Sequence, residues 1–337
     1  MRLAHRVHSA ILVSSLLAIA ALPAWGQENI LVSISSFHDP PGGEIREYTQ
    51  AGGMLWSEFV PPPVALEDED PRDLTVNNGI HLMQNLFPVG DPIQAYLSRY
   101  DGGQWSHVST ADWTQNWQGG VTSYKNYIFA TDYERNLVRF DLDDGYAAER
   151  FGVTADNPFA LEIIDINMGL DCKLYALEVD PGGGVPDIHI YNPDSLAYLG
   201  KIDLTDYLLD FFDDFDARGV AVAANGDIYL ANTYSQIRHL DPDTVTTVNI
   251  LDDVVGSSGL TDIDISVDGQ IVVGSRSATV AMTNLALDPP TTFPIEGRLV
   301  DSFWVSFSSG LDCTALHEVF VDGFENGDTS TWSVSVP

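Results

Sequence analysis

The sequence of 337 residues predicts an all-β protein, a six-bladed β-propeller closed by pairing of its N- and C-terminal strands. First, one strand-rich phrase recurs at intervals of roughly 40 to 52 residues, which suits a four-stranded blade. Second, its clearest copy holds Asn225-Gly226 between two apolar segments, and this dipeptide is typical of a hairpin turn because both residues tolerate positive φ. Third, the first copy lacks an inner strand, and a spare strand-like segment near the other end of the chain can supply it.

The repeat is clearest over residues 219–243, GVAVAANGDIYLANTYSQIRHLDPD. It contains an apolar strand, a turn, a second strand, a polar turn and an ending with a large apolar residue before Asp. Related endings occur at 45–49, 97–102, 137–141 and 188–194. The expected third-strand anchors are Tyr48, Tyr100, Phe140, Tyr191, Leu240 and Met282. Six anchors predict six blades.

Each blade is expected to be a four-stranded meander with its innermost strand at the channel. The blades are expected at about 29–48, 73–108, 120–141, 159–202, 219–250 and 259–282. Because the first of these begins on a second strand, the segment 299–307 is predicted to complete it by pairing with 29–36. A seven-bladed ring with the tail as a seventh sheet is the alternative, but no seventh phrase is found. A parallel α/β fold is disfavoured because only 204–216 could hold a short helix.

Residues 1–26 have the features of a secretory signal peptide. Arg2 and Arg6 precede the apolar stretch 11–22, and Ala24-Trp25-Gly26 offers a small-x-small cleavage site. The stretch is shorter than the roughly 20 residues that span a bilayer, and no cysteine follows the cleavage site to take a lipid anchor. The sequence therefore predicts an exported chain, periplasmic or extracellular, with no membrane span in its mature form. The propeller is expected at 27–313 and a C-terminal tail at 314–337.

The composition is strongly acidic, with 49 Asp and Glu residues against 15 Lys and Arg and a formal net charge of −34. Nucleic acid and anionic membranes are therefore not expected as partners, since both require a positive protein surface. Three explanations of the charge stay open. They are a solubilising surface suited to high salt, calcium binding by carboxylate oxygens, and a cationic partner.

The two cysteines, Cys172 and Cys313, each end the words Gly-Leu-Asp-Cys, and neither belongs to a C-x-x-C pair or a zinc-like Cys/His spacing. Cys172 is expected at the inner hairpin turn of the fourth blade, and Cys313 follows the strand that closes the first. These blades face each other across a six-fold ring, so a bridge requires the chain after residue 307 to cross the channel floor. We predict that it does so and that the two cysteines form a disulfide, which export permits.

The fifth copy, and less closely the third, resemble NHL repeats, which occur also in gluconolactonase-like and streptogramin-lyase-like six-bladed propellers. The resemblance covers roughly 29–307 and implies a ligand site at the channel mouth, on the face of the outer-to-inner and second-to-third connections. Gluconolactonase-like relatives hold a divalent metal there, and the resemblance implies one here. Converging carboxylates at the mouth of this chain suit calcium. The candidate ligands near the starts of inner strands are Asp73, Glu162, Asp216, Asp262 and Asp301. On the plainer interpretation these residues form turns and solvated surface.

The channel mouth and the loops contain candidate ligand-binding residues, because loops on a rigid scaffold often carry function. They are His38, Trp113, Trp117, Tyr133, Arg218 and Tyr234. Exposed aromatic side chains suit sugars, peptides or proteins, although the two tryptophans could equally fill grooves between blades. The scattered histidines do not match the zinc site of amidating-lyase propellers, and no G-x-S-x-G elbow indicates a serine hydrolase.

The segment 318–333 resembles a short tail, roughly FxDGFExGDTSxWS, found on many exported bacterial proteins. Taken together, the sequence predicts an exported, monomeric propeller that binds a protein, peptide or carbohydrate at its loop-rich face without catalysis. One alternative is a metal-dependent lactonase, hydrolase or lyase of the gluconolactonase-like group. The other is a structural protein of the cell envelope.

Overall fold

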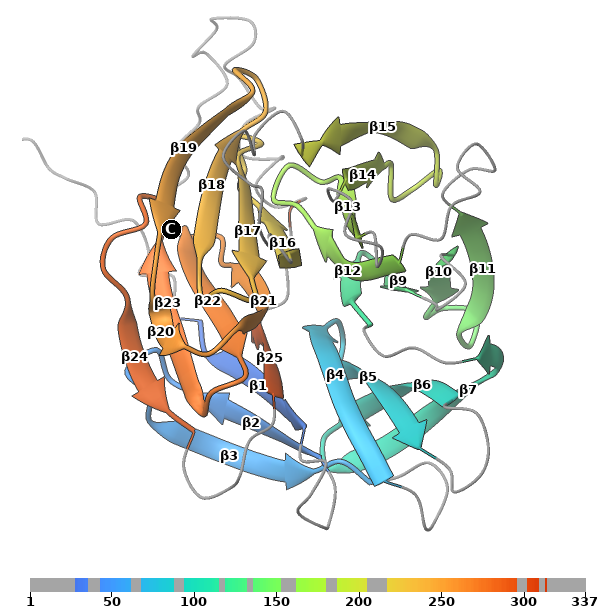
Figure 1. The fold of residues 1–337 in the computed structure, drawn as a ribbon. Helices are drawn as coiled ribbons and strands as arrows, with labels where there is room; N and C mark the ends of the chain where they lie inside the picture. Colours follow the sequence, from blue (N-terminus) through green and yellow to red (C-terminus); the bar gives the residue numbers. More distant parts are fainter. Residues whose placement is uncertain are drawn as a thin grey trace, which may run out of the picture.

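The predicted six-bladed ring is confirmed by a computed structural model, in which six four-stranded antiparallel sheets surround a central axis (Figure 1). The structure describes residues 28–35, 43–61, 68–87, 94–114, 119–131, 136–152, 162–179, 187–204, 217–295, 302–308 and 313. Six sheets in these ranges decide against the seven-bladed alternative. No helix in these ranges is long and apolar enough to cross a membrane. The expected signal peptide, tail and most of the 204–216 segment lie outside them.

The strands are given from the channel outwards in each blade. Blade 1 holds β25 (Ser302–Phe307), β1 (Ile30–Ser35), β2 (Glu44–Tyr48) and β3 (Met54–Phe59). Blade 2 holds β4 (Asp68–Val76), β5 (Ile80–Phe87), β6 (Gln94–Asp101) and β7 (Gln104–Thr114). Blade 3 holds β8 (Val121–Tyr124), β9 (Tyr127–Thr131), β10 (Asn136–Asp141) and β11 (Ala147–Gly152).

The remaining blades follow the same order. Blade 4 holds β12 (Glu162–Met168), β13 (Leu174–Val179), β14 (Asp187–Tyr191) and β15 (Tyr198–Asp203). Blade 5 holds β16 (Ala217–Val222), β17 (Ile228–Asn232), β18 (Ile237–Asp241) and β19 (Thr246–Leu251). Blade 6 holds β21 (Leu260–Ile265), β22 (Gln270–Ser275), β23 (Thr279–Asn284) and β24 (Thr291–Pro294). The short strand β20 (Val254–Ser257) belongs to none of the six sheets and was not predicted.

The ring closes where the sequence predicts, in blade 1. Strand β25 pairs antiparallel with β1 and sets Trp304 opposite Ser33 and Val305 opposite Val32. Beyond the strands, the Ser308 amide donates to the Asn29 carbonyl at 2.9 Å. The first and last strands of the described chain therefore share one sheet, which leaves no unpaired inner edge at the junction.

The six predicted anchors all lie on third strands. Tyr48 pairs with Ile30, Tyr191 with Leu174 and Leu240 with Ile228. These side chains are buried, and they pack into apolar clusters that each join two neighbouring sheets. The core is thus divided into six interfaces between blades, and this explains how a large ring is stable without one central core.

The two faces of the ring differ in the length of their connections. On one face, which we call the floor face, short turns join first strands to second strands and third strands to outer strands, such as β4 to β5 and β18 to β19. The opposite face, the rim face, carries the second-to-third and outer-to-inner connections. The two longest of these join Asp203 to Ala217 and Gly152 to Glu162.

Candidate functional site

Three inner strands place an aspartate at the same position of the channel wall. Asp73 of blade 2, Asp165 of blade 4 and Asp262 of blade 6 each stand beside a β-bulge and immediately before a buried Leu or Ile. A cavity of about 30 Å³ lies among the inner strands. Its lining includes Asp73, Thr122, Asn167, Asp262, Asp264 and Ser306. This volume has room for a water molecule or a bare ion.

Each of these aspartates joins its blade to the next one. Asp73 accepts the Val121 amide of blade 3 on Oδ2 at 2.6 Å, and its other oxygen accepts the Leu74 amide at 2.7 Å. Asp165 accepts the Val220 amide of blade 5 in the same way, at 2.7 Å. A carboxylate that accepts two amide N–H groups satisfies donors that would otherwise be buried without partners.

The closing blade, blade 1, donates two such hydrogen bonds. Asp262 of blade 6 accepts the Val305 amide at 2.9 Å, and Asp264 accepts the Phe307 amide at 3.0 Å. Both amides belong to β25, the strand that completes blade 1. The closure therefore depends on side chains of blade 6 as well as on the pairing of the two chain ends.

Glycine occupies the equivalent position in the intervening blades 3 and 5. A Cβ added to Gly120 would lie 2.4 Å from the Ile166 nitrogen, and one added to Gly219 would lie 3.0 Å from the Asp262 Cα. Each glycine thus lets the aspartate strand of the next blade approach closely. In blade 1 the position is taken by Trp304, with the Arg72 guanidinium 5.0 Å from its ring centroid.

Replacing Gly120 with alanine is expected to destabilise the ring. The new methyl group meets backbone atoms of β12, which cannot move aside as a flexible side chain can, so we expect a loss of about 1–3 kcal/mol in the free energy of unfolding. Urea denaturation measures this loss. Gly53→Ala is the control, because its Cβ would approach only the Thr49 hydroxyl, at 3.3 Å. Equal effects of the two substitutions would contradict the close approach.

The channel carboxyl groups are held in an environment that disfavours their charge. Burial raises the pKa of Asp165 to about 7. Burial also raises the pKa of Asp73 and of Asp262 well above the usual range, and the neighbouring carboxylates add to both shifts. The pKa of Asp264 is raised by burial as well. The channel therefore binds protons at pH values where exposed aspartates have lost theirs.

Of the predicted metal ligands, the structure describes the side chains of Asp73 and Asp262. Both side chains accept hydrogen bonds from backbone amides of the next blade. Calcium binding by them stays a prediction. Glu162 begins β12, but its side chain lies outside the described residues, as do Asp216 and Asp301. Sequence reasoning missed Asp165 and Asp264. The available signal was the recurrence of Asp before Leu or Ile in inner strands.

The predicted ligand-binding residues fall on the rim face or outside the described residues. Arg218 lies at the start of β16 and Tyr234 in the β17–β18 connection, so both belong to the rim end of blade 5. Tyr234 is 52% exposed. Trp113 lies in β7 without a described side chain, and the rest are outside the described residues: His38, Trp117 and Tyr133.

A cluster that the sequence did not predict lies at the rim end of blade 4. Ligand atoms of Glu178, Asp187 and His189 all lie within 4.8 Å of one another. His189 Nε2 is 2.5 Å from Glu178 Oε2, and Lys201 Nζ is 2.6 Å from Asp187 Oδ2. Sequence reasoning treated the histidines as packing or surface residues, because only the register of β13 and β14 brings these three together.

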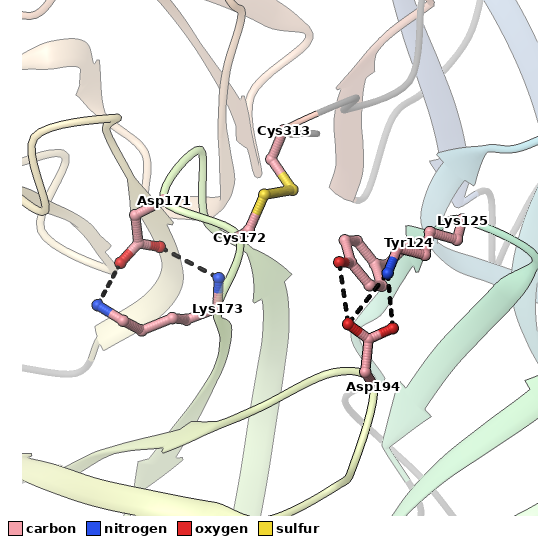
Figure 2. Close-up of a disulfide and its surroundings, with 7 residues drawn as sticks. All are labelled: Tyr124, Lys125, Asp171, Cys172, Lys173, Asp194 and Cys313. Carbon is pink, nitrogen blue, oxygen red and sulfur yellow. Dashed lines mark hydrogen bonds and ion pairs between the residues drawn. A yellow bond between two sulfur atoms is a disulfide. The ribbon is translucent and has the colours of Figure 1, made fainter. Parts of the chain in front are cut away.

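The predicted disulfide is present on the floor face (Figure 2). Cys172, in the turn between β12 and β13, bonds to Cys313 with their Cα atoms 5.4 Å apart. Cys313 is buried in the apolar cluster between blades 3 and 4. Next to the bridge, Asp171 binds the Lys173 ammonium at 2.7 Å and accepts the Tyr175 hydroxyl at 2.8 Å. The chain that leaves blade 1 at Phe307 is thus fixed to the opposite blade.

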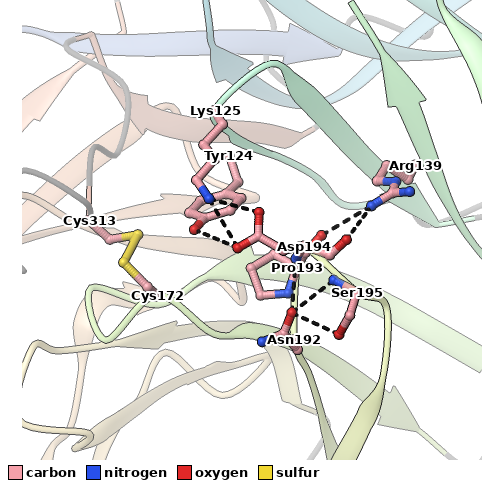
Figure 3. A network of polar contacts seen from close by, with 9 residues as sticks. All are labelled: Tyr124, Lys125, Arg139, Cys172, Asn192, Pro193, Asp194, Ser195 and Cys313. Atoms are coloured by element: carbon pink, nitrogen blue, oxygen red, sulfur yellow. Dashed lines mark hydrogen bonds and ion pairs between the residues drawn. A yellow bond between two sulfur atoms is a disulfide. The ribbon is translucent and has the colours of Figure 1, made fainter.

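Beside the disulfide, polar contacts tie blade 3 to the turn between β14 and β15 of blade 4 (Figure 3). Lys125 Nζ lies 2.7 Å from Asp194 Oδ1, and Arg139 donates to the Asp194 carbonyl at 2.8 Å. The turn itself is shaped by Asn192, whose Oδ1 accepts the Asp194 and Ser195 amides. The floor face is therefore crosslinked both covalently and by charge.

No protein-family model matches the chain, and no curated protein matches it in sequence. Among solved structures, apo AztD from Citrobacter koseri is similar, with a TM-score of 0.44 and 10% sequence identity. The match covers 84% of this chain and 99% of that one. A similarity of this degree carries no information about ligand or activity.

Proposed function

We propose that the protein is an exported binding module that recognises a protein, peptide or carbohydrate at its rim face without catalysing a reaction. The observation that supports this proposal is the difference between the two faces. The longest connections of the ring lie on the rim face, whereas the floor face has short turns and is tied by the disulfide. Binding residues concentrate on loops that a rigid scaffold holds in place.

The small cavity and the hydrogen-bonded aspartates of the channel favour a binding site at the rim over a catalytic site in the interior. Its described cavity of about 30 Å³ admits a water molecule or an ion, while sites for small-molecule ligands are typically hundreds of cubic ångströms. The three equivalent aspartates of its wall are already engaged by backbone amides of neighbouring blades. A ligand of sugar or peptide size is thus expected at the loops around the mouth.

The proposal is tested with a glycan array and a peptide array probed by the purified mature chain. We expect binding to members of one array, and we expect Tyr234→Ala and the double variant Trp113→Ala/Trp117→Ala each to weaken it at least about tenfold, as loss of a binding aromatic does. Met54→Ala is the control, because Met54 is 57% exposed and begins β3 at the floor face. Binding to neither array, or an equal loss in the control, would refute the proposal.

A further inference from the structure

The cluster at the rim end of blade 4 lies on one face of its sheet. Glu178 and Asp187 are directly opposite each other on β13 and β14, and His189 follows Asp187 by two residues. Residues two apart in a strand share a face, so all three side chains belong to the face that also bears Leu174 and Tyr191. Those two residues pack against blade 3, so the cluster lies on the face of blade 4 that is turned toward blade 3.

One of the two ring nitrogens of His189 has no hydrogen-bond partner among the described residues. The residue is 5% exposed, and Nε2 faces Glu178, but Nδ1 is buried and has no hydrogen-bond partner among the described residues. The Tyr191 hydroxyl, on the same face two residues further along, is also buried without a described partner. A neutral ring with its proton on Nδ1 keeps a lone pair on Nε2, the nitrogen that faces Glu178, so His189 can offer Nε2 to a cation.

The charges around the cluster favour a cation. Glu178 is 4% exposed, and its described partner is the His189 ring. Asp187 is paired with Lys201, whose side chain is 47% exposed. An ammonium this exposed can swing into water and release the carboxylate. The chain's net charge of −34 raises the local concentration of cations at any such group.

We propose that Glu178, Asp187 and His189 bind one divalent transition-metal ion of the zinc type at the rim end of blade 4, on the face turned toward blade 3. One imidazole nitrogen and two carboxylates are a donor set that suits zinc, whereas calcium and magnesium take oxygen ligands. Three protein ligands leave a fourth position for water or for an atom of a bound partner. The site is distinct from the channel aspartates and does not depend on the binding function proposed for the rim.

Besides the release of Asp187 by Lys201, the contact between Glu178 and His189 requires an adjustment. Ligands about 2.1 Å from a tetrahedral zinc ion are roughly 3.4 Å apart, so Glu178 must withdraw by about an ångström from its 2.5 Å contact with His189. The carboxylate is at the end of a side chain with three rotatable bonds, so this movement does not require a change in the strands.

The test is a competition titration of the chelator-treated, disulfide-intact protein with Zn²⁺ and a chromophoric chelator. We expect one site per chain, and Ca²⁺ should bind at least about 100-fold more weakly, as the nitrogen donor dictates. His189→Gln and Glu178→Gln should each lower the zinc affinity at least about tenfold, and Asp187→Asn should also lower it. Lys201→Met should not lower it, because the substitution removes a cation beside the site.

His239→Gln is the matched control. His239 also lies on a third strand and contacts one carboxylate, with Nε2 2.8 Å from Asp227 Oδ2, but in the described ranges it is not part of a group of three ligands. Its replacement should leave zinc binding unchanged. A wild-type dissociation constant above about 100 µM, or equal losses in His189→Gln and His239→Gln, would overturn the proposal.

X-ray absorption of the zinc-loaded wild-type protein keeps the proposal falsifiable if the variants fail to fold. The spectrum should show a shell of nitrogen and oxygen ligands at about 2.0–2.2 Å with an imidazole signature. Sulfur ligands at about 2.3 Å, or a shell of oxygen without imidazole, would refute the site.

Discussion

Loss of the Cys172–Cys313 disulfide is expected to lower the free energy of unfolding by about 5 kcal/mol. The bridge joins residues 141 positions apart, and in the chain-entropy model a loop of this length restricts the unfolded chain strongly. Because domains are stable by only about 5–15 kcal/mol, this bridge accounts for a large share of the stability. The measurement is urea denaturation of Cys172→Ser/Cys313→Ser beside the wild-type protein, which should also show a melting temperature lower by about 10 °C.

Three controls separate the bridge from other effects at the same face. Each single cysteine substitution should cost about as much as the double one, and dithiothreitol should destabilise the wild type but not the double variant. Lys125→Met removes the nearby ion pair with Asp194, which is half exposed and should be worth less than about 1 kcal/mol. If reduction leaves the wild-type unfolding curve unchanged, the bridge does not constrain the unfolded chain.

The second large effect is an expected fall in the free energy of unfolding as the pH rises from about 4 to 7. Asp165 has a pKa of about 7 in the folded state and the ordinary value of 3.8 when exposed, so the folded protein holds a proton that the unfolded chain has lost. The stabilisation is therefore fully present below pH 3.8 and is lost as the pH rises to about 7. Its slope is up to about −1.4 kcal/mol per pH unit, which integrates to the order of 4 kcal/mol for this group. Asp73, Asp262 and Asp264 act in the same direction because their pKa values are also raised.

This prediction is tested by urea denaturation at several pH values between 4 and 8. The wild-type protein should be more stable near pH 5 than near pH 7.5, opposite to a protein whose carboxylates are ion-paired. Asp165→Asn should make the slope of the unfolding free energy against pH shallower by up to about 1.4 kcal/mol per pH unit, the contribution of one proton, because the amide cannot titrate. Asp243→Asn, an exposed aspartate on the floor-face turn between β18 and β19, should leave it unchanged. Equal pH slopes in wild type and Asp165→Asn would show that Asp165 does not hold the proton.

The architecture could be predicted because a propeller repeats its own local signals. An Asn-Gly turn, an apolar strand and a large residue before Asp recur with the spacing of a blade, and each copy reinforces the assignment of the others. The closure between 299–307 and 29–36 followed from counting strands, since a ring with one incomplete blade needs a strand from elsewhere. The short strand β20 breaks the repeat, and for that reason no copy of the phrase pointed to it.

The site residues were harder to predict because they depend on register between strands that are distant in sequence. Asp165 and Val220 are 55 positions apart, and only the packing of two blades brings the carboxylate to that amide. Glu178 and His189 are brought together across a hairpin whose connection lies outside the described residues. An aspartate near a strand start reads as a turn former in sequence, whereas here burial gives it a different role.

One resemblance noted in the sequence now has a physical explanation. The third and fifth blades match each other best, and both carry Gly-Val at the start of the inner strand, as Gly120-Val121 and Gly219-Val220. Because the glycine has no side chain, the aspartate strand of the following blade can approach it closely. The valine amide donates a hydrogen bond to the aspartate of the preceding blade. The two blades are therefore alike because they have the same neighbours.

The alternation of aspartate with glycine or tryptophan also limits how such a ring can change in size. Adding or deleting a single blade would set two aspartates side by side, or leave two neighbouring blades with no carboxylate between them. Each aspartate strand lies between two strands with glycine or tryptophan, and this arrangement requires an even number of blades.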